Sequence, residues 1–173
     1  MIRKIRYKIN NETAQKLYDS LILPHISYCI LIWGNSYKST TSNIAKLQKR
    51  ALRLCFNINF SNTVCCSHKN KLLLHNLYNL QVAQIVHHYF YTPNLLPNCV
   101  SALFKKTSDI HGYQTRSLDN LCLFANFFRL NIRKSSLKIS APTIWNNFPT
   151  SVRFLSSFYL FKREVKSYLQ LNS

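Results

Sequence analysis

The sequence is poor in glycine, and this shortage excludes several classes of protein. Only two of its 173 residues are glycine, Gly34 and Gly112. All-β folds need many glycine-containing turns, so the shortage favours helices. It also excludes glycine-rich phosphate loops, because the chain has neither a GxGxxG pattern nor a P-loop. We therefore expect a mainly α fold.

Acidic residues are the second shortage. The chain has five of them against 23 lysines and arginines, which gives a net charge of +18. Two-metal polymerases and nucleases hold Mg²⁺ with converging carboxylates, but no two acidic residues here form a DxD or DD motif. No serine or cysteine lies in a recognisable nucleophile turn. We expect no catalytic residue and no enzymatic activity from this chain on its own.

Long apolar runs and paired cysteines are also missing. No window reaches the roughly 18 apolar residues of a membrane span. The first residues, MIRKIRYKIN, lack the apolar core of a secretory signal, which predicts an intracellular protein of the nucleus or cytoplasm. The six cysteines include no CxxC pair, and the cluster Cys65, Cys66, His68 and His75 does not have zinc-finger spacing. We expect scattered reduced thiols, no bound metal and no cofactor.

The apolar residues that are present predict a folded, helical N-terminal region. Hydrophobic residues make up 47% of the chain and aromatic residues 13%, as in folded proteins. Asn11 is a candidate N-cap, and Glu12 suits the positive end of the helix dipole. Helical spacing then relates four apolar residues, Ala14, Leu17, Tyr18 and Leu21. Pro24 either kinks this helix or begins the next, and the buried helix is expected to end at Gly34.

The next helix is expected to follow a cap at Thr41 or Ser42 and to end near Phe56. At about 100° per residue, one arc is apolar and predicts the buried face: Ile44, Leu47, Ala51 and Leu54. The opposite arc carries a basic stripe: Lys46, Lys49, Arg50 and Arg53. A solvated face is one explanation of this stripe. Because like charges on one helix face repel one another and no acidic residue is interleaved, we favour contact with phosphates.

We expect two regions, divided by a change in composition after Lys105. Residues 1–104 are predicted to be a helical region, in which 67–91 form two further helices. Residues 105–173 are predicted to be a small, mainly α C-terminal segment that opens with a polar turn around Gly112.

Three elements are predicted within the C-terminal segment. Apolar and polar residues alternate in 121–124 and 129–140, which predicts the strands of a short β hairpin. A short helix is expected between Pro142 and Pro149, and an amphipathic helix over 156–171. One side of this last helix is basic, with Lys162, Arg163 and Lys166.

Five stretches carry a further pattern: 17–29 (LYDSLILPHISYC) with Trp33-Gly34-Asn35, 47–53 (LQKRALR), 113–117 (YQTRS), 141–149 (APTIWNNFP) and 161–169 (FKREVKSYL). Together, and in this order, they resemble the C-terminal part of reverse transcriptases of non-LTR retrotransposons, in particular the jockey or CR1-like LINE group. The resemblance covers nearly the whole chain from about Ala14.

This resemblance implies a thumb-like helical bundle in the first region, followed by a post-thumb segment. In that family the polymerase site carries a Tyr-x-Asp-Asp turn in the palm domain, upstream of these stretches, and the endonuclease lies further upstream. No position here matches either site, so no catalytic residue carries over. The resemblance implies a fragment of an RNA-directed DNA polymerase that adjoins the palm in the parent enzyme and grips the template–primer duplex.

The expected partner is therefore RNA or an RNA–DNA duplex, bound through its backbone with little sequence readout. The role of the basic stripe is inferred from the charge pattern and not from the family. Arg116 either contacts phosphate or anchors a loop. Tyr113 is a candidate for base stacking, and Trp145 either stacks on a base or packs in the core.

Several alternatives remain open at the level of sequence. The first alternative is a stand-alone or domesticated basic nucleic-acid-binding protein without polymerase ancestry. The second is an intact enzyme whose upstream part is missing from the sequence, and the third is a membrane-surface protein. We expect a truncated element in which Met1 is an internal start. An in-frame Tyr-x-Asp-Asp codon run upstream would instead favour the intact enzyme.

Overall fold

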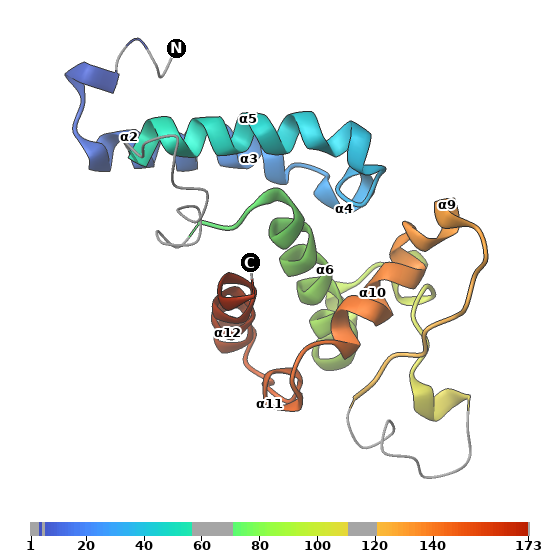
Figure 1. Ribbon diagram of the computed structural model, residues 1–173. Helices are drawn as coiled ribbons and strands as arrows, with labels where there is room; N and C mark the ends of the chain where they lie inside the picture. Colours follow the sequence, from blue (N-terminus) through green and yellow to red (C-terminus); the bar gives the residue numbers. More distant parts are fainter. Residues whose placement is uncertain (1–3, 5, 57–70, 111–120, 173) are drawn as a thin grey trace. The chain divides into compact units, whose positions relative to one another are not determined.

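The computed structural model describes residues 4, 6–56, 71–110 and 121–172 (Figure 1). These residues are mainly helical, and the only extended pairing among them is an isolated antiparallel bridge between Lys106 and Leu123. The predicted mainly α fold is therefore confirmed. None of the described helices combines the length and the apolar character that crossing a membrane requires.

The chain forms two compact units, residues 1–78 with 170–173 and residues 79–169. Their boundary lies inside helix α6 (Leu74–Tyr91), whereas the composition of the sequence placed it at 104/105. Helix α6 is continuous, so the prediction of two helices over 67–91 is wrong for its described part.

The first unit begins with a long helical rod made of α2 (Asn11–Leu17), the π-helical turn η2 (Tyr18–Ile22) and α3 (Leu23–Ser27). The N-cap is Asn10, one residue before the predicted cap, and its Oδ1 accepts the Asn11 N–H at 2.6 Å. Pro24 explains the π turn, because it has no N–H and its ring crowds the carbonyl of residue 20. The wider turn instead joins the Leu23 N–H to the Tyr18 carbonyl.

The predicted helix to Gly34 is interrupted at residues 28–29. Tyr28 is extended and Cys29 has a left-handed φ of 50°, after which α4 (Ile30–Trp33) begins. Gly34 then approaches its neighbours closely: a Cβ there would lie 2.5 Å from the Ile30 carbonyl oxygen and 2.9 Å from Tyr78 Cδ2. Glycine is required at this position because backbone and ring leave no room for a side chain.

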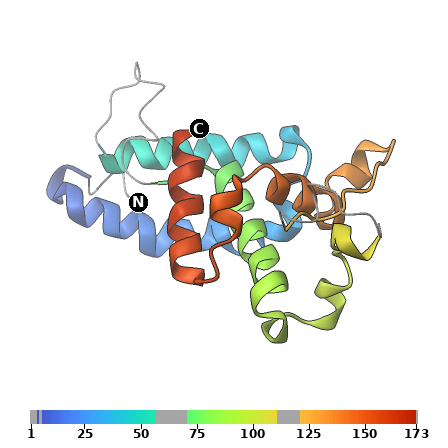
Figure 2. The ribbon, with the colours of Figure 1, turned by 90° about the horizontal axis from the view of Figure 1, so that it is seen from below.

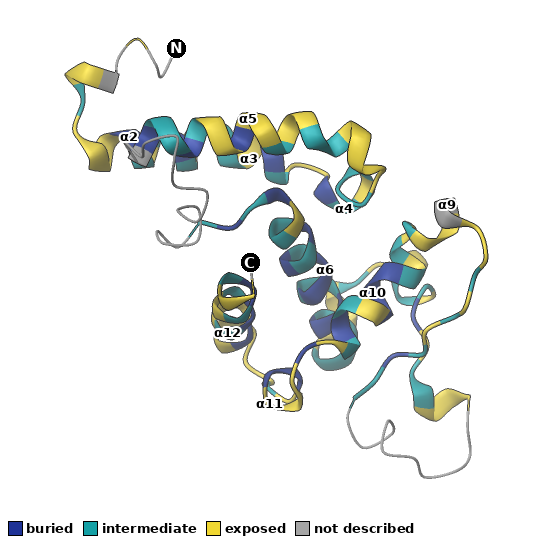
Figure 3. Ribbon diagram, in the orientation of Figure 1, coloured by how far each residue is buried: buried dark blue, intermediate teal, exposed yellow. Residues whose placement is uncertain are grey.

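Helix α5 (Lys38–Phe56) begins earlier than predicted and runs antiparallel beside the rod of α2, η2 and α3, as Figures 1 and 2 show. The two are joined by a core of Ala14, Tyr18, Leu52 and Cys55. Figure 3 shows exposed residues over much of α5, and the burial becomes greater towards its C-terminal end, where none of residues 51–55 is exposed.

The second unit contains the rest of α6 together with α10 (Leu137–Asn146) and α12 (Phe158–Leu171). Trp145 is fully buried at its centre, where the indole stacks on Phe90 with ring centroids 5.4 Å apart, and its Nε1–H donates to the Leu121 carbonyl at 2.8 Å. Core packing, one of the two alternatives for Trp145, is thereby confirmed. Along α12 the buried residues Phe161, Val165 and Leu169 confirm the predicted amphipathic helix.

The predicted β hairpin is wrong. Residues 131–134 are not a strand but the short helix α9 (Asn131–Lys134), and α10 begins at Leu137, five residues before the proline at which its start was expected. The stretch around Leu123 is extended, but its partner is Lys106. The side-chain amide of Asn146 completes this arrangement, because it accepts the Leu123 N–H at 3.0 Å and donates to the Leu123 carbonyl at 2.8 Å.

Short elements complete the description: η1 (Arg6–Lys8), η3 (Pro93–Leu95), α7 (Asn98–Ser101), η4 (Thr107–Asp109) and α11 (Thr150–Arg153).

A buried histidine lies among the aromatic rings of the second unit. His87 stacks on Phe161 with ring centroids 4.4 Å apart, and its Nε2 lies 2.8 Å from the Leu155 carbonyl oxygen. Since a carbonyl only accepts, Nε2 carries the proton, and the buried Nδ1 has no hydrogen-bond partner among the described residues. Burial lowers the pKa of His87, the bond to Leu155 opposes this shift, and the neighbouring His88 adds to it.

Candidate nucleic-acid interface

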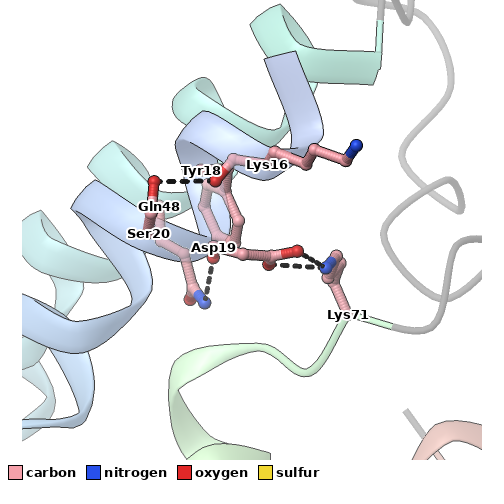
Figure 4. Close-up of polar contacts among 6 residues, drawn as sticks. All are labelled: Lys16, Tyr18, Asp19, Ser20, Gln48 and Lys71. Atoms are coloured by element: carbon pink, nitrogen blue, oxygen red, sulfur yellow. Dashed lines mark hydrogen bonds and ion pairs between the residues drawn. The ribbon is translucent and has the colours of Figure 1, made fainter. Parts of the chain in front are cut away.

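The orientation of α5 is set by a buried glutamine. Gln48 is only 1% exposed, and both ends of its amide are satisfied. Figure 4 shows its contact with Tyr18. Its Nε2 donates to the Tyr18 hydroxyl at 3.1 Å and to the Leu72 carbonyl at 3.0 Å, and its Oε1 accepts the Leu74 N–H at 2.8 Å. One side chain thus joins three segments of the first unit and fixes which face of α5 is turned inward.

This inward face is not the one that the apolar pattern predicted. The buried residues are Gln48, Leu52 and Cys55, whereas Leu47 is 64% exposed and Ile44 36% exposed. The predicted apolar arc is therefore wrong in its N-terminal half. The physical reason is that a fully hydrogen-bonded amide can be buried at little cost, so Gln48 lies where a leucine was expected.

The basic stripe lies on the outward face. At about 100° per residue, its centre is about 150° around the helix from Gln48. Lys46, Lys49 and Arg50 are exposed, and Arg53 is half-buried. All four predicted residues therefore share one face of one regular helix.

No described acidic side chain pairs with the exposed part of this stripe. Helix α5 contains no aspartate or glutamate, and Lys46, Lys49 and Arg50 form no ion pair with any residue that the structure describes. Asp19, an acidic residue of the same unit, is instead paired with Lys71, whose Nζ lies 2.5 Å from its carboxylate (Figure 4).

The stripe has dimensions that suit a nucleic-acid backbone. From Lys46 to Arg53 it extends about 10 Å along the helix axis, at about 1.5 Å per residue. Duplex DNA carries roughly one phosphate per 1.7 Å of its axis, so several phosphates fall within that length. Neighbouring cations repel one another by a few tenths of a kcal/mol per pair, and contact with phosphates removes this repulsion.

No protein-family model, curated protein or solved structure matches this chain. What this site can bind is therefore inferred from its residues and geometry alone.

The sequence offers three further candidates for contact with nucleic acid, Arg116, Tyr113 and Trp145. Arg116 and Tyr113 lie outside the described residues, and Trp145 is buried in the second unit. Of the cysteine and histidine cluster, only His75 is described, and no three metal-ligating side chains come together in the described part of the chain.

Gln48 is the residue that sequence reasoning missed. Its spacing to Leu52 and Cys55, at i, i+4 and i+7, is the signal that could have identified it as part of the buried face. A polar residue in that pattern was easy to assign to the surface, because its partners lie 24 to 30 residues away in the sequence.

Proposed function

We propose that this chain is the thumb and post-thumb part of a non-LTR retrotransposon reverse transcriptase, and that it binds template–primer duplex without catalysing polymerisation itself. The observation that carries the proposal is the exposed basic stripe of α5, which lies opposite a well-defined core face and has no acidic neighbour on its helix. The net charge of +18 supports the same class of partner.

The mode of binding follows from the side chains in the stripe. Lysines and arginines on one helix face can approach successive phosphates, and such contacts position a protein without reading sequence. The proposed partner is accordingly an RNA–DNA hybrid or RNA duplex, bound inside the cell in the nucleus or cytoplasm. In the parent enzyme the palm domain would supply the active site.

The test is a salt titration of binding. Fluorescence anisotropy with a labelled RNA–DNA hybrid is measured from about 50 to 200 mM salt, where counterion release makes phosphate contacts visible. Changing Lys46, Lys49, Arg50 and Arg53 to Gln should flatten the plot of log affinity against log salt by roughly 2.7 to 3.6, since each duplex phosphate contact contributes roughly 0.9.

A matched variant separates a site from bulk charge. This control changes Lys105, Lys162, Arg163 and Lys166 to Gln. It removes four positive charges, the same number as the stripe variant, from the second unit. Circular dichroism is used to check that both variants remain folded. If the slope of log affinity against log salt falls by the same amount in the two variants, the stripe of α5 is not a binding site and the proposal is wrong.

A stand-alone basic nucleic-acid-binding protein is the second candidate. The first unit favours it, because residues of this chain alone form its core and supply the hydrogen-bond partners of the buried Gln48 amide. It predicts the same result for the stripe variant. The coding sequence upstream distinguishes the two, because only the polymerase origin predicts a Tyr-x-Asp-Asp run there, intact or decayed.

A further inference from the structure

A short stretch of the second unit carries both exposed aromatic and exposed basic side chains. Phe127 is 87% exposed and Leu130 is 64% exposed, both in the irregular stretch that leads into α9. Four exposed cations lie in the same stretch and the two helices after it: Arg129, Arg133, Lys134 and Lys138. We call these four cations and Phe127 the basic–aromatic segment.

None of these cations forms an ion pair with a carboxylate that the structure describes. The sequence contains no acidic residue between Asn120 and Arg163. Within the described part of the second unit, the two carboxylates are engaged elsewhere. Asp109 accepts the Lys106 N–H at 3.3 Å, and Glu164 lies 3.4 Å from the Arg163 guanidinium.

Two of the four cations, Arg133 and Lys134, are held on a defined turn. The N–H groups of Arg133 and Lys134 both donate to the Leu130 carbonyl, at 3.1 and 3.3 Å, and the Ser136 hydroxyl donates to the Arg133 carbonyl at 2.8 Å. The Arg133 guanidinium lies over the Phe128 ring, 5.5 Å from its centroid. Helix α9 is followed after two residues by α10, which contacts it and carries the buried residues Ser140, Ala141 and Trp145.

We propose that the basic–aromatic segment binds single-stranded nucleic acid, with one base stacked on Phe127 and the adjacent phosphates on the four cations. An exposed aromatic ring among lysines and arginines is the arrangement with which proteins bind single strands irrespective of sequence. A base inside a duplex cannot stack on the Phe127 ring, because the neighbouring base pairs already cover both of its faces. An acidic membrane fits less well, since interfacial binding needs an extended apolar helix face and α9 has only four residues.

The inference shares with the proposed function only the class of partner. Its residues lie in the second unit, whereas the basic stripe lies in the first. The two sites therefore make separate predictions, one for single strands and one for duplex, and either can fail alone.

The test measures the binding of labelled oligo(dT) to variants that change either the Phe127 ring or the charges of the segment. Phe127→Ala should weaken binding roughly 5- to 150-fold, which corresponds to the stacking of one base on an aromatic ring. Phe127→Trp should retain the affinity, and its exposed indole should lose fluorescence when the oligonucleotide binds. Changing Arg129, Arg133 and Lys134 to Gln should weaken binding and flatten its salt slope by roughly 0.7 per lost contact.

The control removes the same number of charges from α12 of the same unit, by changing Lys162, Arg163 and Lys166 to Gln. This variant should bind oligo(dT) more tightly than the segment variant. Equal losses in the two variants, or an unchanged affinity in Phe127→Ala, would overturn the proposal. So would vesicles of acidic lipid that displace the oligonucleotide from the wild-type chain but not from the segment variant, because the segment would then be a membrane contact.

Discussion

Replacing Gln48 by alanine should destabilise the first unit more than any surface change on α5. The substitution leaves the Leu72 carbonyl and the Leu74 N–H without their partner, and removes the bond to Tyr18. A buried backbone group that loses its partner costs about 1–3 kcal/mol. Two such groups, with a cavity that water can partly fill, give an expected loss of about 2–4 kcal/mol in the free energy of unfolding.

Two further variants separate the causes of that loss. Gln48→Met keeps most of the volume, so it should lose stability mainly through the missing hydrogen bonds. Asn43→Ala changes an exposed amide on the same helix and should shift stability by no more than about 0.5 kcal/mol.

Urea unfolding followed by far-UV circular dichroism measures all three variants, with the change in midpoint converted at constant slope. If Gln48→Met were as stable as the wild type, the amide would not be holding α5 in place. The inward orientation of that helix, and with it the exposed position of the basic stripe, would then need another explanation.

Two predictions concern other buried positions. Gly34→Ala should destabilise the first unit by several kcal/mol, because its Cβ would meet the Ile30 carbonyl oxygen at 2.5 Å. Thermal unfolding measures this loss, and a wild-type midpoint would contradict the close packing. His87 has a lowered pKa, so the native state binds fewer protons than the unfolded state, and stability should fall as the pH drops below about 6.5. The slope should be at most about 1.4 kcal/mol per pH unit and should be absent from His87→Leu, measured by urea unfolding between neutral and mildly acidic pH; an equal slope in this variant would refute the assignment.

Helix content and the basic stripe were predictable from local pattern. Glycine scarcity predicted the fold class, and the 3.6-residue period predicted α5 and α12, because helix faces are a property of nearby residues. The stripe followed from the same period. Its charge pattern is independent of which neighbours cover the other side of the helix.

Local sequence patterns failed in two places. The alternation that predicted a strand over 129–140 includes Leu130 and α9, where the Leu130 carbonyl accepts two N–H groups and closes a helical turn. The break at Cys29, in a left-handed conformation, has no sequence signal such as glycine. A short alternation of apolar and polar residues does not exclude a helical turn, and a left-handed residue other than glycine has no sequence signature.

The sequence alone determined that this is a helical, strongly basic protein without a DxD or DD motif. Composition and helical periodicity are local properties, so they do not depend on tertiary contacts. Only the tertiary structure decided which face of α5 is buried, because the partners of Gln48 come from segments distant in the chain. It also decided that Trp145 lies in a core while Phe127 is exposed. Burial is a property of the three-dimensional neighbourhood, so two aromatic residues of one chain can differ completely in it.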